Sequence, residues 1–229
     1  MKREAMANIL FGVTGSVAAI RTPELYGALV QAGHQIKVVA TQAALYFFDP
    51  AIIAPSNPNQ SQRNPDVVIL DDDEWPGRAT GRRWQRNDPV LHIELRRWAD
   101  LLLIAPLDAN TLAKLAHGLA DNCLTCVWRA WDPERPIVLA PAMNTLMWKH
   151  KLTEQHFLML AGHAGISADT EGPSGDWVVP DSAVEWVNNN CPQLCVVPPA
   201  SKQLACGDFG VGAMAELDEI ADAVEEMLE

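Results

Sequence analysis

The segment Pro141-Ala142-Met143-Asn144 has the residue types and the position to bind a ligand. It follows the short apolar run Ile137 to Ala140, which predicts a buried strand. A strand that ends in this way places the amide side chain of Asn144 at the carboxyl edge of a sheet, where open α/β sheets bind their ligands. Taken alone, the segment is equally well interpreted as a turn followed by core packing of Met147 and Trp148.

A second candidate for ligand binding is Gly12-Val13-Thr14-Gly15-Ser16, where a predicted strand over Asn8 to Val13 turns into a helix. Glycine lets the backbone approach a ligand closely, and free N–H groups together with the Ser16 hydroxyl suit a phosphate. The six-residue dinucleotide fingerprint is absent, and Thr41 rather than an acidic residue ends the next strand. The pattern favours a mononucleotide phosphate over NAD, although many tight turns have the same glycine spacing.

A third strand end carries Asp108. This residue follows the predicted strand Leu101 to Ala105 and precedes a predicted helix from Ala109 to His117, which Gly118 ends. An aspartate in this position predicts an N-cap, with its carboxylate accepting a hydrogen bond from the first turn of the helix.

Two further side chains suit proton transfer. His92 lies about one turn into a helix predicted from Asp88-Pro89 to Trp98, and an imidazole can exchange protons near neutral pH. A lone histidine is, however, more often a hydrogen-bonded structural residue. Cys206 precedes a run with three glycines in six residues, Gly207 to Gly212, which predicts a flexible or tightly turned loop. That loop is either a lid over a pocket or an ordinary connection to the last helix, Glu216 to Leu228.

The elements that must position these residues alternate between strand and helix. Strands are predicted over Asn8 to Val13, Gln35 to Ala40, Leu101 to Ala105 and Ile137 to Ala140. This alternation predicts an α/β fold, a doubly wound (Rossmann/flavodoxin-like) open parallel sheet with helices on both faces, and 229 residues fit a single domain. Pro23 is expected to kink the first helix, and Thr41 is expected to cap a helix over Gln42 to Phe48.

Two stretches interrupt the pattern. Residues 54–87 are interpreted as a surface insertion, with a short strand at Val67 to Leu70 and with acidic (71–74) and basic (78–86) runs as solvated faces. Residues 169–200 are interpreted as an irregular insertion with short strands near 177–179 and 194–197.

Composition limits the classes of function. A formal net charge of −12 argues against a general nucleic-acid or anionic-membrane binder. No apolar run is long enough to cross a membrane, no export signal is recognised, and the five cysteines are expected to be reduced thiols of a cytoplasmic protein. A zinc site built from Cys123, Cys126, Cys191 and Cys195 is disfavoured by their spacing, so no metal is expected.

The motifs GVTGSVAA, LHIELRRWADLLLIAPLDANTLAKLA, PAMNTLMW and LACGDFGVGAMAE occur together and in this order. Together they resemble the homo-oligomeric flavin-containing cysteine decarboxylases, specifically the phosphopantothenoylcysteine decarboxylase group. The resemblance runs from about Asn8 to Glu216 and implies a flavoprotein domain over 1–229 with FMN as cofactor. The flavin contacts it implies are Gly15, Ser16, Val17, Thr41, Ala43, Asp108, Ala109, Asn110, Thr111 and Ala142.

The same resemblance implies a reaction and its residues. FMN-dependent decarboxylation of 4′-phosphopantothenoylcysteine to 4′-phosphopantetheine, a step of coenzyme A synthesis, would use His92 and Cys206 as catalytic groups. Residues 201–216 would form a flap over the substrate, and the implied substrate contacts are Asn144, Gln203, Ala205 and Met214. The family more often has Ser at Asp108 and a basic residue at Gln203. It assembles as homotrimers with active sites at subunit interfaces, which are expected here too.

Two related functions remain open. Some relatives with acidic extensions are non-catalytic regulatory subunits of a protein phosphatase, whereas this chain has no long acidic tail and keeps His92, Asn144 and Cys206. Other relatives act on peptidyl cysteine or join prenyl groups to flavin, and those are not expected to carry the complete LACGDFGVGAMAE segment.

Overall fold

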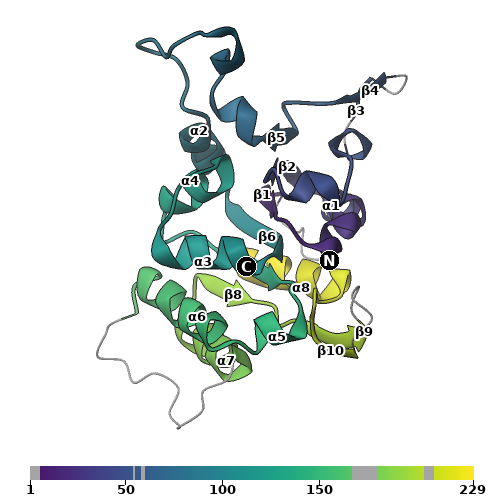
Figure 1. The fold of residues 1–229 in the computed structure, drawn as a ribbon, viewed down its shortest axis with the longest axis vertical. Helices are drawn as coiled ribbons and strands as arrows, with labels where there is room; N and C mark the ends of the chain where they lie inside the picture. The colour runs from purple at the N-terminus through teal and green to yellow at the C-terminus, as the bar shows by residue number, and fades with distance from the viewer. Residues whose placement is uncertain (1–5, 54, 58–59, 167–179, 204–208) are drawn as a thin grey trace.

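The centre of the molecule is a parallel sheet of six strands (Figure 1). The computed structural model describes residues 6–53, 55–57, 60–166, 180–203 and 209–229. The sheet order is β5-β2-β1-β6-β7-β8, and every neighbouring pair is parallel. The strands are β1 (Asn8–Val13), β2 (Gln35–Ala40), β5 (Val68–Leu70), β6 (Leu101–Leu107), β7 (Ile137–Pro141) and β8 (Leu194–Val196). Numbered among themselves these strands run 3-2-1-4-5-6, the doubly wound order, so the predicted fold is confirmed.

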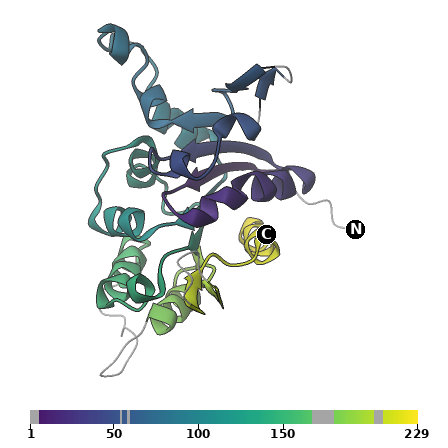
Figure 2. The same cartoon turned by 45° about the vertical axis from the view of Figure 1, so that its right-hand side comes forward.

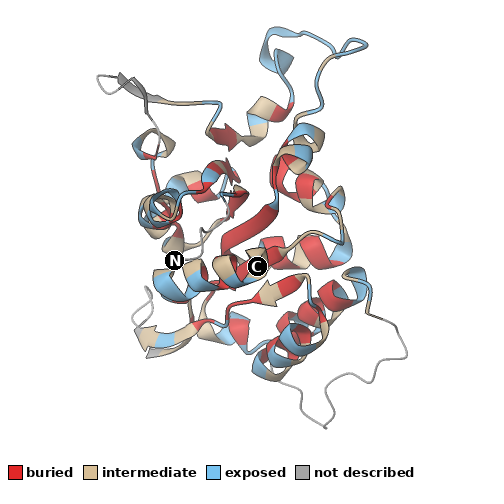
Figure 3. Ribbon diagram, turned by 180° about the vertical axis from the view of Figure 1, so that it is seen from behind, coloured by how far each residue is buried: buried red, intermediate tan, exposed pale blue. Residues whose placement is uncertain are grey.

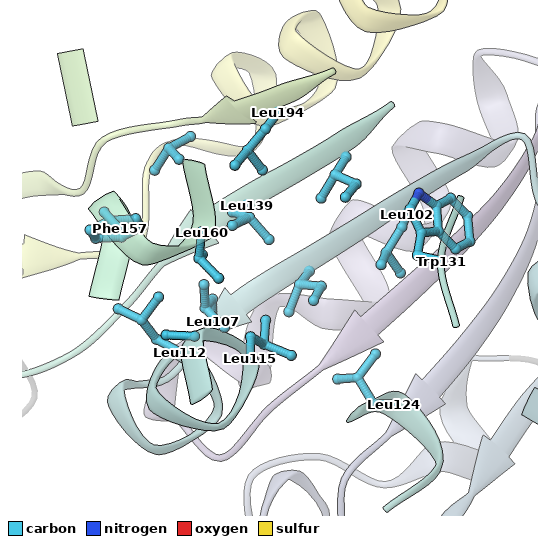
Figure 4. Close-up of a cluster of buried hydrophobic side chains, with 14 of the residues drawn as sticks. Leu102, Leu107, Leu112, Leu115, Leu124, Trp131, Leu139, Phe157, Leu160 and Leu194 are labelled. Atoms are coloured by element: carbon cyan, nitrogen blue, oxygen red, sulfur yellow. The ribbon is translucent and has the colours of Figure 1, made fainter. Parts of the chain in front are cut away.

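Helices cover both faces of the sheet because its strands are apolar on both sides; all seven residues of β6 are buried. One core lies under α2 (Leu91–Trp98), α3 (Ala109–His117), α4 (Cys123–Arg129), α6 (Lys151–His163) and α7 (Pro180–Asn190) (Figure 4). The other lies under α1 (Thr22–Gln31) and α8 (Leu217–Leu228) (Figure 2). Successive residues of β1 alternate between the cores, with Leu10 in the first and Ile9 and Phe11 in the second. The buried central strands stand out in Figure 3.

Three local predictions about helices need correction. The first helix is not a single kinked helix: a 3-10 segment (η1, Val17–Arg21) precedes α1, and Pro23 lies in the first turn of α1, where a missing N–H costs nothing. After β2 only a 3-10 turn forms (η2, Ala44–Tyr46), and Thr41 does not cap it through its side chain. Asp88 does not cap α2, because its carboxylate already accepts from Arg82 (2.6 Å) and from the Gln85 N–H (2.8 Å).

The range 54–87 is not a surface insertion throughout. Val68–Leu70 forms β5, the edge strand of the main sheet, and the next turn, η4 (Asp71–Glu74), buries Glu74. The acidic run is therefore not a solvated face throughout: Asp72 is exposed, whereas Glu74 is buried. The remainder holds a small antiparallel pair, β3 (Pro55–Asn57) with β4 (Gln60–Arg63), and one more 3-10 turn, η5 (Arg78–Thr80). A further 3-10 turn, η3 (Pro50–Ile52), comes just before the range.

The range 169–200 is more regular than predicted. Residues 180–190 form α7, and Leu194–Val196 completes the sheet as β8. The strand expected near 177–179 lies outside the described residues. The predicted flap begins and ends in an antiparallel hairpin of β9 (Ala200–Gln203) and β10 (Phe209–Ala213). No helix within the described ranges is long and apolar enough to cross a membrane.

The carboxyl ends of β1 and β6 are tied together by the side chain of Thr14. Its hydroxyl donates to Pro106 O (2.7 Å) and accepts from the Asp108 N–H (2.7 Å), and the Thr14 N–H donates to Pro106 O (3.3 Å). Thr14 is fully buried, so these bonds do not exchange with water. The tie fixes the spacing of the two strand ends beyond the last ladder bonds.

We predict that Thr14→Val lowers the free energy of unfolding by about 1–3 kcal/mol, because the Asp108 N–H then loses its acceptor. Valine keeps the shape of threonine, and Thr14→Ser keeps the hydroxyl and serves as the control. Urea unfolding of flavin-free protein at one fixed protein concentration measures the difference. Equal stability of the valine and serine variants would contradict the bridging role.

Candidate functional site

The strand order reverses between β1 and β6, and open α/β sheets bind ligands in the crevice at such a point. Here three loops converge at the carboxyl ends of the strands. A methyl group at Gly15 would lie 2.6 Å from Cβ of Ala43 and 3.1 Å from Oδ2 of Asp108. Glycine is therefore required where the loops after β1, β2 and β6 meet, and the structure brings together three of the residues expected to contact a flavin.

Thr41 directly follows β2, beside this crevice. Its N–H donates to Val13 O (3.0 Å) at the end of β1, while its Oγ1 is buried without a hydrogen-bond partner within the described residues. A buried hydroxyl without a partner is unfavourable by roughly 1–3 kcal/mol, which a polar ligand atom would recover. Thr41 thus fits a bound polar group better than it fits an empty crevice.

The other residues expected to contact the flavin lie around the same crevice and differ in their hydrogen bonds and in their exposure to solvent. Ser16 Oγ accepts from the Ala18 N–H (3.4 Å) as the N-cap of η1, and Val17 is exposed. Asp108 caps α3, as predicted, with Oδ1 accepting from the Thr111 N–H (2.6 Å). Thr111 is itself buried, and Asn110 on the same first turn is exposed.

Asn144 is held at the carboxyl edge of β7. Its Oδ1 accepts from the Leu146 N–H (2.8 Å), which makes it the N-cap of the short helix α5 (Thr145–Trp148). The preceding residues are fixed on both sides: the Ala142 N–H donates to Leu107 O (2.9 Å), and the Met143 N–H donates to Gly212 O (2.8 Å). The amide therefore lies between the end of β6 and the base of the β9–β10 hairpin.

The hairpin brings the segment of the predicted flap to Asn144. Gly212 in β10 has φ +132°, and a methyl group there would overlap Met143 O. Met214, an expected substrate contact, is buried in the core next to Ala215. The backbone of Gln203 pairs with Phe209. Ala205 and Cys206 lie outside the described residues.

His92 lies in the first turn of α2, and its partner was not foreseen. Its Nδ1 is 2.5 Å from Oε1 of Glu74, whose side chain is buried. A cavity of about 470 Å³ borders Glu74, and arginine and tryptophan side chains form much of its wall. Within one chain His92 and Asn144 lie on separate elements: Figure 1 shows α2 in the upper half of the molecule beside α4, and α5 in the lower half beside β10.

Sequence reasoning missed Glu74 because it treated the acidic run as one solvated feature. The available signal was its place directly after Val68–Leu70, since residues that follow a parallel strand lie at the binding edge. Thr14 was part of a quoted motif, but the sequence offers no sign of its bridge to the end of β6.

The cysteine pairs do not form a common site. Cys123 and Cys126 lie on α4, whereas Cys191 and Cys195 flank the start of β8. Burial, and after it the negative charges of Glu74 and Asp71, raise the pKa of the Cys123 thiol. A thiol that stays protonated is a poor metal ligand and a poor nucleophile. No group of three or more potential metal ligands is found in the part of the chain that the structure describes.

Comparisons with known proteins agree with this geometry. The Flavoprotein family matches residues 2–229. Phosphopantothenoylcysteine decarboxylase of Mus musculus is 40% identical over 227 residues, with 98% of this chain and 89% of the mouse protein covered. Phosphopantothenoylcysteine decarboxylase HAL3 of Malus domestica is 42% identical, with 96% of this chain and 83% of the apple protein covered.

Solved structures give the same result. A PPC decarboxylase mutant complexed with pantothenoylaminoethenethiol superposes with a TM-score of 0.73 at 38% identity, covering 97% of this chain and 98% of the other. The FMN-binding protein AtHal3 superposes with a TM-score of 0.69 at 39% identity, covering 97% and 96% of the two chains.

The chain has a doubly wound parallel sheet with a crevice at its switch point, and the Flavoprotein family matches nearly its whole length. These findings define the chain as a flavoprotein. The chain belongs to the phosphopantothenoylcysteine decarboxylase family. FMN is the cofactor, and the residues present fit it. The Thr41 hydroxyl lacks a partner within the described residues, Gly15 leaves room for close approach, and Asp108 directs one carboxylate oxygen to its helix.

We predict that Gly212→Ala destabilises the protein by more than Gly165→Ala. Both glycines have positive φ (+132° and +91°), so both variants lose about 1–2 kcal/mol from backbone strain. Only the new methyl group at 212 meets another atom, Met143 O, which adds about 1–3 kcal/mol. Urea unfolding compares the two, and equal losses would show that the hairpin is not pressed against the Asn144 loop.

Proposed function

We propose that this protein decarboxylates 4′-phosphopantothenoylcysteine to 4′-phosphopantetheine with FMN as its redox cofactor. The observation that carries the proposal is the position of Asn144, held between the end of β6 and the base of the hairpin that leads to Cys206. The family relatives named above support it, since they carry this activity in their names and align over most of their length.

The chemistry explains why a flavin is needed. Direct loss of CO₂ from a cysteine carboxylate would leave a carbanion without stabilisation, whereas a thioaldehyde at the neighbouring carbon accepts the electron pair. Bound FMN supplies the hydride acceptor that oxidises the thiol and later returns the hydride. Two electrons leave the substrate and two return, so the net reaction is substrate plus a proton giving product and CO₂.

Asn144 binds the substrate carboxylate in this proposal. Its Oδ1 accepts from the Leu146 N–H, so the amide orientation is fixed and Nδ2 is the group that can donate to a carboxylate. The carboxylate is thereby held until the electron sink has formed. Positioning of this kind contributes to catalysis without any covalent step on the protein.

His92 and Cys206 handle the protons. His92 accepts the thiol proton when the substrate is oxidised, and its ring is partly exposed so that a ligand can reach it. Cys206 donates a proton when the enethiol left by CO₂ loss is reduced. In this proposal residues 201–216 cover the substrate, so that the proton from Cys206 is delivered where water is limited.

The active site is proposed to form between subunits of a homotrimer. The helices whose starts carry His92 and Asn144, α2 and α5, lie in different halves of the molecule in Figure 1, and in this proposal a second copy brings its His92 to the Asn144 and flavin crevice. Large apolar side chains exposed around that crevice suit such a contact. They are Val17, Ile20, Tyr46, Leu146 and Met147. A reducing cytoplasm suits the thiols on which the mechanism depends.

The first prediction of this proposal is that purified protein loaded with FMN releases CO₂ from 4′-phosphopantothenoylcysteine and forms 4′-phosphopantetheine. Cys206→Ser should still release CO₂ but accumulate the oxidised enethiol, because reduction of that intermediate lacks its proton donor. Mass spectrometry of the products, with the visible spectrum recorded on the same sample, tests both.

Cys195→Ser is the matched control, since Cys195 lies in β8, the edge strand of the main sheet, and has no part in the proposed reaction. Unchanged 4′-phosphopantetheine formation by Cys206→Ser would remove the proton-donor role. A flavin-loaded protein without CO₂ release would instead favour the non-catalytic alternative, a regulatory subunit built on the same fold.

The second prediction concerns the shared site. His92→Asn and Asn144→Asp should each be inactive alone, whereas co-expression of the two in equal amounts should restore about a quarter of the sites, because each interface draws one half from each neighbour. Turnover per bound flavin measures the recovery. If co-expression restores nothing while mixed trimers are present, His92 and Asn144 do not act in one shared site.

A further inference from the structure

We propose that Glu74 is the residue that positions His92 for proton transfer, acting through a buried carboxylate–imidazole pair. The inference rests on the proposed function, because it assigns a role within that reaction to a residue outside every motif described above. It follows from the geometry of the turn η4 and the first turn of α2.

The pair is short and asymmetric in its exposure. Oε1 of Glu74 lies 2.5 Å from Nδ1 of His92, with the Glu74 side chain 2% exposed and the His92 side chain 20% exposed. A carboxylate removed from water in this way needs a charged or strongly donating partner, and His92 provides it. The imidazole, in contrast, keeps a path to the surface.

Both residues lie at the binding edge of the sheet. The turn η4 directly follows β5, and α2 leads into the start of β6, so its first turn lies at the carboxyl edge. The adjoining cavity of about 470 Å³ reaches Glu74 and Val90, one residue before α2. Glu74 therefore borders a space that a ligand can enter, and His92 lies two residues beyond Val90 in the wall of that space.

The turn that presents Glu74 is anchored by its other acidic residues. Asp71 Oδ2 accepts from the Gln42 N–H (3.0 Å), and Asp73 Oδ2 accepts from the Leu70 N–H (2.8 Å). Asp73 Oδ1 also binds the Arg63 guanidinium (2.7 Å). These bonds tie the turn to the loop after β2, to β5 and to β4, so the backbone that carries Glu74 is fixed independently of His92.

A fixed acceptor on Nδ1 determines the state of the imidazole. The Nδ1–H donates to Glu74, which leaves Nε2 unprotonated and able to take a proton from a substrate thiol. Once that proton is taken, the carboxylate stabilises the resulting cation. Carboxylate–histidine pairs act in this way in metal sites and in serine hydrolases.

The test compares Glu74→Ala and Glu74→Gln with Asp72→Asn, an exposed acid in the same turn. Glu74→Ala should lower kcat by about 10- to 100-fold with KM little changed, since the carboxylate orients a group that acts in the chemical step. Glu74→Gln keeps an acceptor and should lose less, and Asp72→Asn should match the original protein. Wild-type kcat in both Glu74 variants would overturn the proposal.

Nitrogen-15 NMR of the unaltered FMN-loaded protein provides a readout that a merely structural contact would not move. His92, assigned by comparison with His92→Asn, should show the Nδ1–H tautomer, and Glu74→Ala should shift the population toward Nε2–H. A predominantly Nε2–H ring in the unaltered protein would overturn the proposal even if the variants do not fold. If the protein releases no CO₂, the proposed function fails, while the tautomer still decides the pairing.

Discussion

The binding edge of this protein depends on the hydroxyl of Thr14. By donating to Pro106 O and accepting from the Asp108 N–H, it joins the ends of β1 and β6, the two strands between which the winding of the sheet reverses. Backbone hydrogen bonds connect the next loops along the same edge: the Ala142 N–H donates to Leu107 O, and the Met143 N–H donates to Gly212 O. Each bond fixes the start of the next loop, so the crevice, the Asn144 amide and the base of the hairpin form one rigid series.

His92 is positioned by a different part of the fold. Its helix, α2, packs against α4 and η4. The His92 ring is held by Glu74 in the turn that follows β5, an edge strand of the sheet. Asn144 and His92 are thus held on the two sides of the point where the winding of the sheet reverses, Asn144 after β7 and His92 by the turn after β5. This arrangement suits a site that a second copy of the chain completes. Each subunit then presents one rigid part of the site on its surface, and no single subunit needs a cavity that holds both parts.

The sequence predicted most of the sheet because its strands are buried on both faces and stand out as continuous apolar runs. The Asp108 cap and the stop at Gly118 were also predictable, since each depends only on the nearest turn. Asp88 has the same local signal as Asp108 but binds Arg82, and no local rule ranks those two partners. β8 was hard to place in the sheet because it is a three-residue edge strand, and its pairing with β7 depends on distant residues.

The acidic run shows what a charge pattern leaves undetermined. In a 3-10 turn, residues three apart lie on the same side, so Asp71 and Glu74 both face inward toward the start of α4, while Asp72 faces solvent. Two inward carboxylates would repel each other unless each had its own donors. Asp71 accepts from the Gln42 and Cys123 N–H groups, and Glu74 meets His92 eighteen residues further along the chain. The fold therefore tolerates a run of four acidic residues at a partly buried edge, because each carboxylate that points inward has its own hydrogen-bond donor. For Glu74 that donor is the His92 imidazole, the group to which proton transfer is assigned.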